Sequence, residues 1–180
     1  MTQIRIHGRG GQGVVTAAEL IAMAAFFDGK EAQAFPSFGV ERTGAPIEAF
    51  ARIDNKPIRT REHIYQPDIL IIQDSTLLGT IDVTKGCGKS TKVIVNSAKD
   101  ITDLKIDLPI KNIFILDATA IALEKIGRNI VNTVILGALS RSTGIITLKS
   151  LKKAIEQKFA QKGKKIINKN IGAIEKAYNT

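Results

Sequence analysis

The chain has 180 residues, of which 44% are hydrophobic and 24% are charged. This length and composition suit a single domain over residues 1–180 with a core of its own, and they exclude a disordered chain. No uncharged apolar run approaches 18 residues, and the first residues lack the apolar stretch of a signal peptide, so we expect a cytoplasmic protein with no membrane contact. The single cysteine, Cys87, excludes an internal disulfide and any all-cysteine metal or iron–sulfur site built by this chain alone.

The formal net charge is +9, and it is distributed unevenly. Nine lysines stand against two glutamates in residues 149–180, which gives this part +7 and leaves +2 for the rest. We interpret 149–180 as a basic helical part with a solvated lysine face. It contains no arginine, and its only aromatic residues are Phe159 and Tyr178, so we do not expect nucleic-acid binding. A third interpretation is a docking surface for an acidic partner or a polyphosphate.

Apolar periodicity predicts alternating strands and helices along the chain. The predicted strands cover residues 3–7, 31–35, 47–53, 69–72, 92–95 and 113–116. The predicted helices cover 14–27, 76–79, about 118–126, 129–140, an apolar stripe over 148–159, and 168–178, with Asp74 and Asp117 as N-caps.

This order predicts a three-layer α/β/α domain with a Rossmann-like, mostly parallel sheet. The apolar run Ile69–Ile72 is typical of a strand that is buried on both faces of a parallel sheet. Residues 47–53 follow the preceding strand too closely for a helical crossover. We therefore expect that segment to be antiparallel and the sheet to be mixed.

The segment between the first strand and the first helix reads Gly8-x-Gly10-x-x-Gly13. Glycines in this position let the backbone approach a phosphate, and the helix N-terminus supplies free N–H groups. The acidic residue that would bind a ribose is missing at the end of the second strand, so a nicotinamide dehydrogenase is not favoured. A phosphate-binding loop remains, beside the alternative of a tight turn without a ligand.

Other candidate motifs predict no chemistry. Residues 86–90 resemble the end of a P-loop, but Val83 stands where the first glycine is needed and a strand follows, which excludes an ATPase. His7, His63 and Cys87 have no ligand-like spacing, and no base is adjacent to the cysteine in sequence. We expect both histidines to be structural or exposed.

The loop that follows the second strand is unusual. It places Phe35, Phe38 and Val40 among glycines and prolines, either as an interface or as packing at the edge of the core. Arg42 and Thr43 beside a glycine would suit an anion or a subunit contact.

The glycine segment 8–17 and the segment 34–46 together resemble the gamma subunit of the 2-oxoacid:ferredoxin oxidoreductases. The resemblance continues through residues 67–70, 132–138 and 151–159. Within that family, the run Glu41-Arg42-Thr43-Gly44-Ala45-Pro46 is similar to the pyruvate enzymes.

This resemblance implies a CoA-dependent oxidative decarboxylation that yields acyl-CoA, carbon dioxide and reduced ferredoxin. The chemistry uses thiamine diphosphate, Mg²⁺ and iron–sulfur clusters, and this chain lacks the motifs that bind them. We therefore expect an accessory subunit that is inactive alone and works with alpha, beta and delta subunits, with ferredoxin reached through the complex.

The resemblance also implies a share in binding coenzyme A. The candidate site residues are Gly8, Arg9, Gly10, Gly11, Gln12, Gly13, Arg42 and Thr43. No residue is predicted to be catalytic or to bind a metal. The apolar loop predicts a homodimer when the chain is isolated. A free-standing nucleotide-binding or regulatory α/β module is the alternative function.

Overall fold

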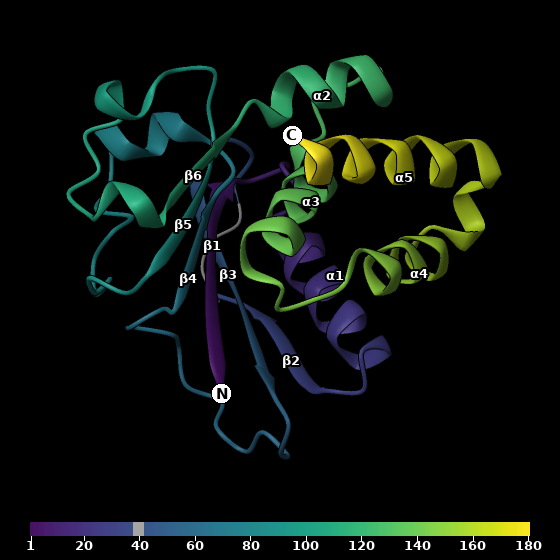
Figure 1. The fold of residues 1–180 in the computed structure, drawn as a ribbon, viewed down its shortest axis with the longest axis horizontal. Helices are drawn as coiled ribbons and strands as arrows, with labels where there is room; N and C mark the ends of the chain where they lie inside the picture. Colours follow the sequence, from purple (N-terminus) through teal and green to yellow (C-terminus); the bar gives the residue numbers. More distant parts are fainter. Residues whose placement is uncertain (38–41) are drawn as a thin grey trace.

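A six-stranded sheet forms the centre of the computed structural model, which describes residues 1–37 and 42–180 (Figure 1). The strand order is β2-β3-β1-β4-β5-β6. The strands are β1 (Thr2–Arg9), β2 (Glu31–Pro36), β3 (Pro46–Asp54), β4 (Ile69–Ile72), β5 (Lys92–Asn96) and β6 (Ile113–Leu116).

The sheet is mixed, as predicted. Strands β1, β4, β5 and β6 are parallel neighbours, whereas β3 pairs antiparallel with both β1 and β2. The short connection between β2 and β3 leaves no room for a crossover helix, which is the physical reason for the antiparallel pairing. The predicted α/β class with a mostly parallel sheet is therefore confirmed.

In the described part of the chain, five α-helices lie on one side of the sheet (Figure 1). They are α1 (Val14–Phe27), α2 (Ala118–Lys125), α3 (Val131–Thr143), α4 (Leu148–Lys158) and α5 (Lys164–Asn179). Their buried residues form one cluster with alternate side chains of the strands, such as Ile69 and Ile71 of β4. The last helix begins at Lys164, four residues before the predicted start.

The opposite face of the sheet is covered by loops and short 3-10 helices. These are η1 (Ser75–Gly79), η2 (Ile101–Asp103) and η3 (Ile110–Asn112), while η4 (Ala160–Lys162) lies between α4 and α5. Leu70 and Ile72 of β4 pack here with Leu77, Val83 and Leu104. The third layer thus exists, but it consists of 3-10 turns and loops, and β4 is buried on both faces as its apolar run predicted.

The predicted N-caps are confirmed. The Asp74 carboxylate accepts a hydrogen bond from the Thr76 backbone N–H at the start of η1, and the Asp117 carboxylate accepts one from Ala120 at the start of α2. Asp74 stands two residues after β4 and Asp117 directly after β6, and so both caps place acidic side chains at the carboxyl edge of the sheet. No helix of the described residues is long and apolar enough to cross a membrane.

Candidate functional site: the glycine loop at the carboxyl edge of the sheet

The glycine loop lies against the segment 42–45, which follows the residues that the structure leaves undescribed. The Gly10 N–H donates to the Ala45 carbonyl oxygen at 2.9 Å, and the Gly44 N–H donates to the Gly10 carbonyl oxygen at 3.0 Å. Gly10 and Thr43 also form an isolated parallel bridge. The structure therefore brings together the two motifs that the sequence singled out.

Glycine at position 10 is required by this contact. A Cβ built on Gly10 would overlap the carbonyl oxygen of Arg42, which is backbone and cannot rotate away. At the end of the loop, Gly13 adopts a left-handed conformation as the N-cap of α1, and its carbonyl oxygen accepts a hydrogen bond from the Asn132 amide at 3.2 Å. The glycine spacing is thus explained in part by contacts within the chain.

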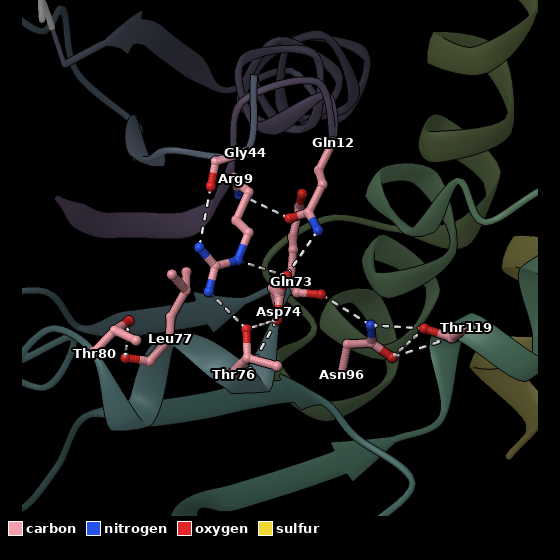
Figure 2. A network of polar contacts seen from close by, with 10 residues as sticks. All are labelled: Arg9, Gln12, Gly44, Gln73, Asp74, Thr76, Leu77, Thr80, Asn96 and Thr119. Carbon is pink, nitrogen blue, oxygen red and sulfur yellow. Dashed lines mark hydrogen bonds and ion pairs between the residues drawn. The ribbon is translucent and has the colours of Figure 1, made fainter. Parts of the chain in front are cut away.

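The guanidinium of Arg9 is engaged inside the protein, as Figure 2 shows. Its Nε lies 3.2 Å from a carboxylate oxygen of Asp74, and its two terminal nitrogens donate to the Gly44 carbonyl oxygen at 3.1 Å and to the Thr76 hydroxyl at 2.8 Å. Three N–H groups of Arg9 thus have partners within the protein, and a part for Arg9 in binding coenzyme A stays a prediction.

Gln12 completes this network (Figure 2). Its amide oxygen accepts from the Arg9 backbone N–H at 2.7 Å, and its amide nitrogen donates to Asp74 at 2.9 Å. Burial tends to raise the pKa of Asp74, but hydrogen bonds from Thr76 and Gln12 and the charge of Arg9 prevail, so the pKa is lowered. Asp74 is therefore ionised, and its contacts with Arg9 and Gln12 hold the glycine loop in place.

Three of the predicted site residues remain open to solvent. Gly11, Arg42 and Thr43 are exposed, next to the N-terminus of α1, which has no side-chain cap among the described residues. The first N–H groups of a helix carry partial positive charge and attract anions. Phe38 to Glu41, which the resemblance also involved, lie outside the described residues.

A cavity of about 450 Å³ adjoins the loop at the carboxyl ends of β4, β5 and β6. Polar side chains form much of its lining, among them Gln12, Gln73, Asp74, Asn96, Asp117 and Thr119. The Gln73 side chain is only 1% exposed, and neither of its amide atoms has a partner among the described residues. An unpaired buried amide is costly, so this position suits a ligand that offers hydroxyl or amide groups.

Apart from Gln12, sequence reasoning did not identify these lining residues as part of a site, although the signal was present. Gln73 and Asp74 follow β4, Asn96 and Ser97 stand at the end of β5, and Asp117 follows β6. The carboxyl ends of parallel strands meet at one edge, which is where open α/β sheets bind ligands. At this edge, the Asn96 amide donates to the Gln73 carbonyl oxygen at 2.9 Å and to the Thr119 hydroxyl at 3.0 Å (Figure 2).

The other candidates lie outside this site. Cys87 is half-buried, and burial raises the pKa of its thiol, which disfavours the reactive thiolate. His7 is buried on the second face of the sheet, and His63 is exposed beside the Phe50 ring. Phe35, which we considered for an interface, packs on Phe50 at 5.1 Å between ring centroids. Phe38 and Val40 lie outside the described residues.

The mixed sheet and the glycine loop at the end of β1 define an α/β protein of the Rossmann-like class. The model of the pyruvate ferredoxin/flavodoxin oxidoreductase family matches residues 3–180. The pyruvate synthase subunit PorC of Methanocaldococcus jannaschii is 52% identical over 179 residues, which cover 99% of this chain and 96% of that protein. The common gamma subunit of the pyruvate/ketoisovalerate oxidoreductases of Pyrococcus furiosus is 48% identical, with 99% and 96% covered.

The solved structures agree with these relatives. The crystal structure of the pyruvate oxidoreductase subunit PORC of Thermotoga maritima superposes with a TM-score of 0.85 at 38% identity, and covers 99% of this chain and 95% of that one. The chain therefore belongs to the pyruvate ferredoxin/flavodoxin oxidoreductase family, and it is a gamma-type subunit of such an oxidoreductase. Family membership favours the subunit over the free-standing module as its function.

Proposed function

We propose that this chain helps an oxidoreductase complex to bind coenzyme A during the oxidative decarboxylation of a 2-oxoacid, with pyruvate as the substrate. The products are acyl-CoA, carbon dioxide and reduced ferredoxin. The observation that carries the proposal is the exposed end of the glycine loop, where Gly11, Arg42 and Thr43 adjoin the uncapped N-terminus of α1 and a polar cavity.

Coenzyme A has the chemistry that this edge would recognise. Its phosphates suit the helix N-terminus and the Arg42 guanidinium. Its hydroxyl and amide groups suit the cavity, where the amide of Gln73 has no partner among the described residues. Gly8, Arg9, Gly10, Gln12 and Gly13 would act indirectly, because they hold the loop in place.

The reaction also needs groups that we assign to partner subunits. A four-cysteine iron–sulfur cluster cannot be built from the one cysteine of this chain, and no group of three histidine, cysteine or acidic side chains in the described ranges could hold a metal ion. We therefore propose that thiamine diphosphate, Mg²⁺ and the clusters reside on alpha, beta and delta subunits. The isolated chain would be inactive, and it would form a homodimer.

Substitution of Arg42 by alanine in the assembled complex tests the coenzyme A role. The loss of one charge-assisted phosphate contact weakens binding by about 1.5–3 kcal/mol. We therefore expect the KM for coenzyme A to rise by about tenfold to a hundredfold, while the KM for pyruvate changes little. Arg61, an exposed arginine in the loop before β4, provides the matched control as Arg61→Ala.

The kinetics are measured on complexes first shown to be intact by gel filtration. A uniform fall in activity with unchanged Michaelis constants would assign Arg42 to subunit docking. Intact complexes with unaltered coenzyme A kinetics would mean that the glycine loop is a structural turn and that the ligand role is wrong.

A further inference from the structure

A second cavity, of about 440 Å³, lies on the helical side of the molecule. It is bounded by the start of α1, the loop between α2 and α3, and one face of η4 and α5. The loop between α2 and α3 separates it from the first cavity. Asn129 and Val131 line the first cavity, whereas Arg128, Ile130 and Asn132 line the second.

Four cationic side chains line this second cavity, and no carboxylate does so among the described residues. The cations are Arg128, Lys162, Lys165 and Lys169. The spacing of the three lysines places them on one face of the chain as it enters α5. A cluster of like charges is unfavourable unless a counter-charge offsets it.

Other lysines of the basic C-terminal part do have counter-charges within the protein. Lys158 pairs with Glu19 at 2.6 Å, Lys152 pairs with Glu175, and Lys176 pairs with Glu124. None of the four cavity cations forms an ion pair within the described ranges. Three lysines of the basic part are thus paired with glutamates, and three others line the cavity.

Two of the cavity cations are held in place. The Lys169 ammonium donates to the Ile126 carbonyl oxygen at 2.9 Å, near the end of α2, and the Lys162 ammonium lies 5.4 Å from the centroid of the Phe159 ring. Helix α5 begins after Gly163 without a side-chain cap among the described residues, so its first N–H groups add positive potential. Prepositioned donors lower the entropic cost of binding an anion.

The rest of the lining is largely apolar. Ile130 and Ile166 are 38% and 41% exposed, and the Phe159 ring also contributes to the wall. A cavity of this size with an apolar wall and a few convergent polar groups is typical of small-molecule sites. Nucleic acid would instead need a charged stripe along a surface with several stacking rings.

We propose that this cavity binds a small organic anion, with phosphate groups at the four cations and an aromatic or apolar group against Ile130, Phe159 and Ile166. A nucleoside diphosphate has this chemistry. The site is separate from the glycine loop and does not depend on the coenzyme A role of Arg42.

Calorimetric titration of the full chain with ADP and with inorganic pyrophosphate tests the proposal. We expect both to bind, ADP more tightly because of the apolar wall, and both more weakly at high salt. Arg128→Gln and Lys165→Gln should each weaken ADP binding by about tenfold, as expected for the loss of a charge-assisted contact. Lys149→Gln removes an exposed lysine of the same basic part outside the cavity and should leave binding unchanged.

Four results would overturn the proposal. The first is that neither probe binds, and the second is that Lys149→Gln weakens binding as much as Lys165→Gln, which indicates non-specific attraction. The third is that Arg42→Ala abolishes ADP binding, which would assign ADP to the glycine-loop site. The fourth is that a glutamate-rich peptide binds through the same lysines while ADP does not, which would indicate a docking surface for an acidic protein segment.

Discussion

The carbonyl oxygen of Arg42 fills the space into which a side chain at Gly10 would project. This contact joins the glycine loop to the segment after β2, and two backbone hydrogen bonds flank it. Backbone atoms cannot move aside as a flexible side chain can, so the loop and the segment 42–45 behave as one unit.

We predict that Gly10→Ala destabilises the protein by about 1–3 kcal/mol, because even one methyl group forces the two segments apart. Urea unfolding followed by circular dichroism measures this change. Gly88→Ala is the control, since nothing lies within 4 Å of a Cβ at Gly88. Equal stability of the two variants would show that the backbone near Arg42 can move away from the added methyl group without a loss of stability.

The end of α1 is tied to the start of α4 by Asp28. Its carboxylate accepts hydrogen bonds from the Thr147 N–H at 2.8 Å, the Thr147 hydroxyl at 2.7 Å and the Ser150 hydroxyl at 2.6 Å. Burial tends to raise the pKa of Asp28, but the hydrogen bonds from Ser150 and Thr147 and the nearby charge of Lys30 prevail and lower it.

We predict that Asp28→Asn lowers the free energy of unfolding at pH 7 by about 1–3 kcal/mol, because hydrogen bonds to a charged acceptor are lost. A lowered pKa in the folded state stabilises the protein above the ordinary carboxyl pKa of about 4 and ceases to do so as the pH falls below it. The deficit of the variant should therefore shrink below pH 4. Asp107→Asn, in an exposed loop, should have little effect at either pH.

Burial also determines the protonation of His7. The side chain is 2% exposed, and neither ring nitrogen has a hydrogen-bond partner among the described residues. Desolvation, reinforced by the positive charge of Arg5, lowers the pKa of His7 to about 3. Glu48 lies 3.6 Å away, but its side chain is 38% exposed and screened by water, so its attraction for a proton does not outweigh burial.

His7 should make the protein less stable as the pH falls. The unfolded chain takes up a proton near pH 6.5, whereas the folded chain keeps His7 neutral down to about pH 3. Between pH 7 and pH 5 this difference removes about 2 kcal/mol from the free energy of unfolding. We predict that His7→Gln flattens this pH dependence, whatever its effect on absolute stability. An unchanged slope would show that His7 is protonated in the folded protein.

Local patterns in the sequence were sufficient for most of the fold. The apolar run Ile69–Ile72 predicted a strand buried on both faces, and Asp74 and Asp117 were predicted as N-caps. These features depend on a residue and its near neighbours, so periodicity and capping chemistry reveal them. The elements that cover the sheet face opposite the helices were less predictable, because short 3-10 helices such as η2 and η3 have no strong sequence periodicity.

The candidate site depended far more on tertiary structure. The sequence by itself determined the α/β class, the antiparallel β3 and the family resemblance carried by residues 8–17 and 34–46. Only the folded chain decided that Arg9 binds Asp74, 65 residues further along, and that Arg128 and Lys165 face one cavity. The physical reason is that charges and donors act through space over a few ångströms, and the packing of sheet and helices decides which of them meet.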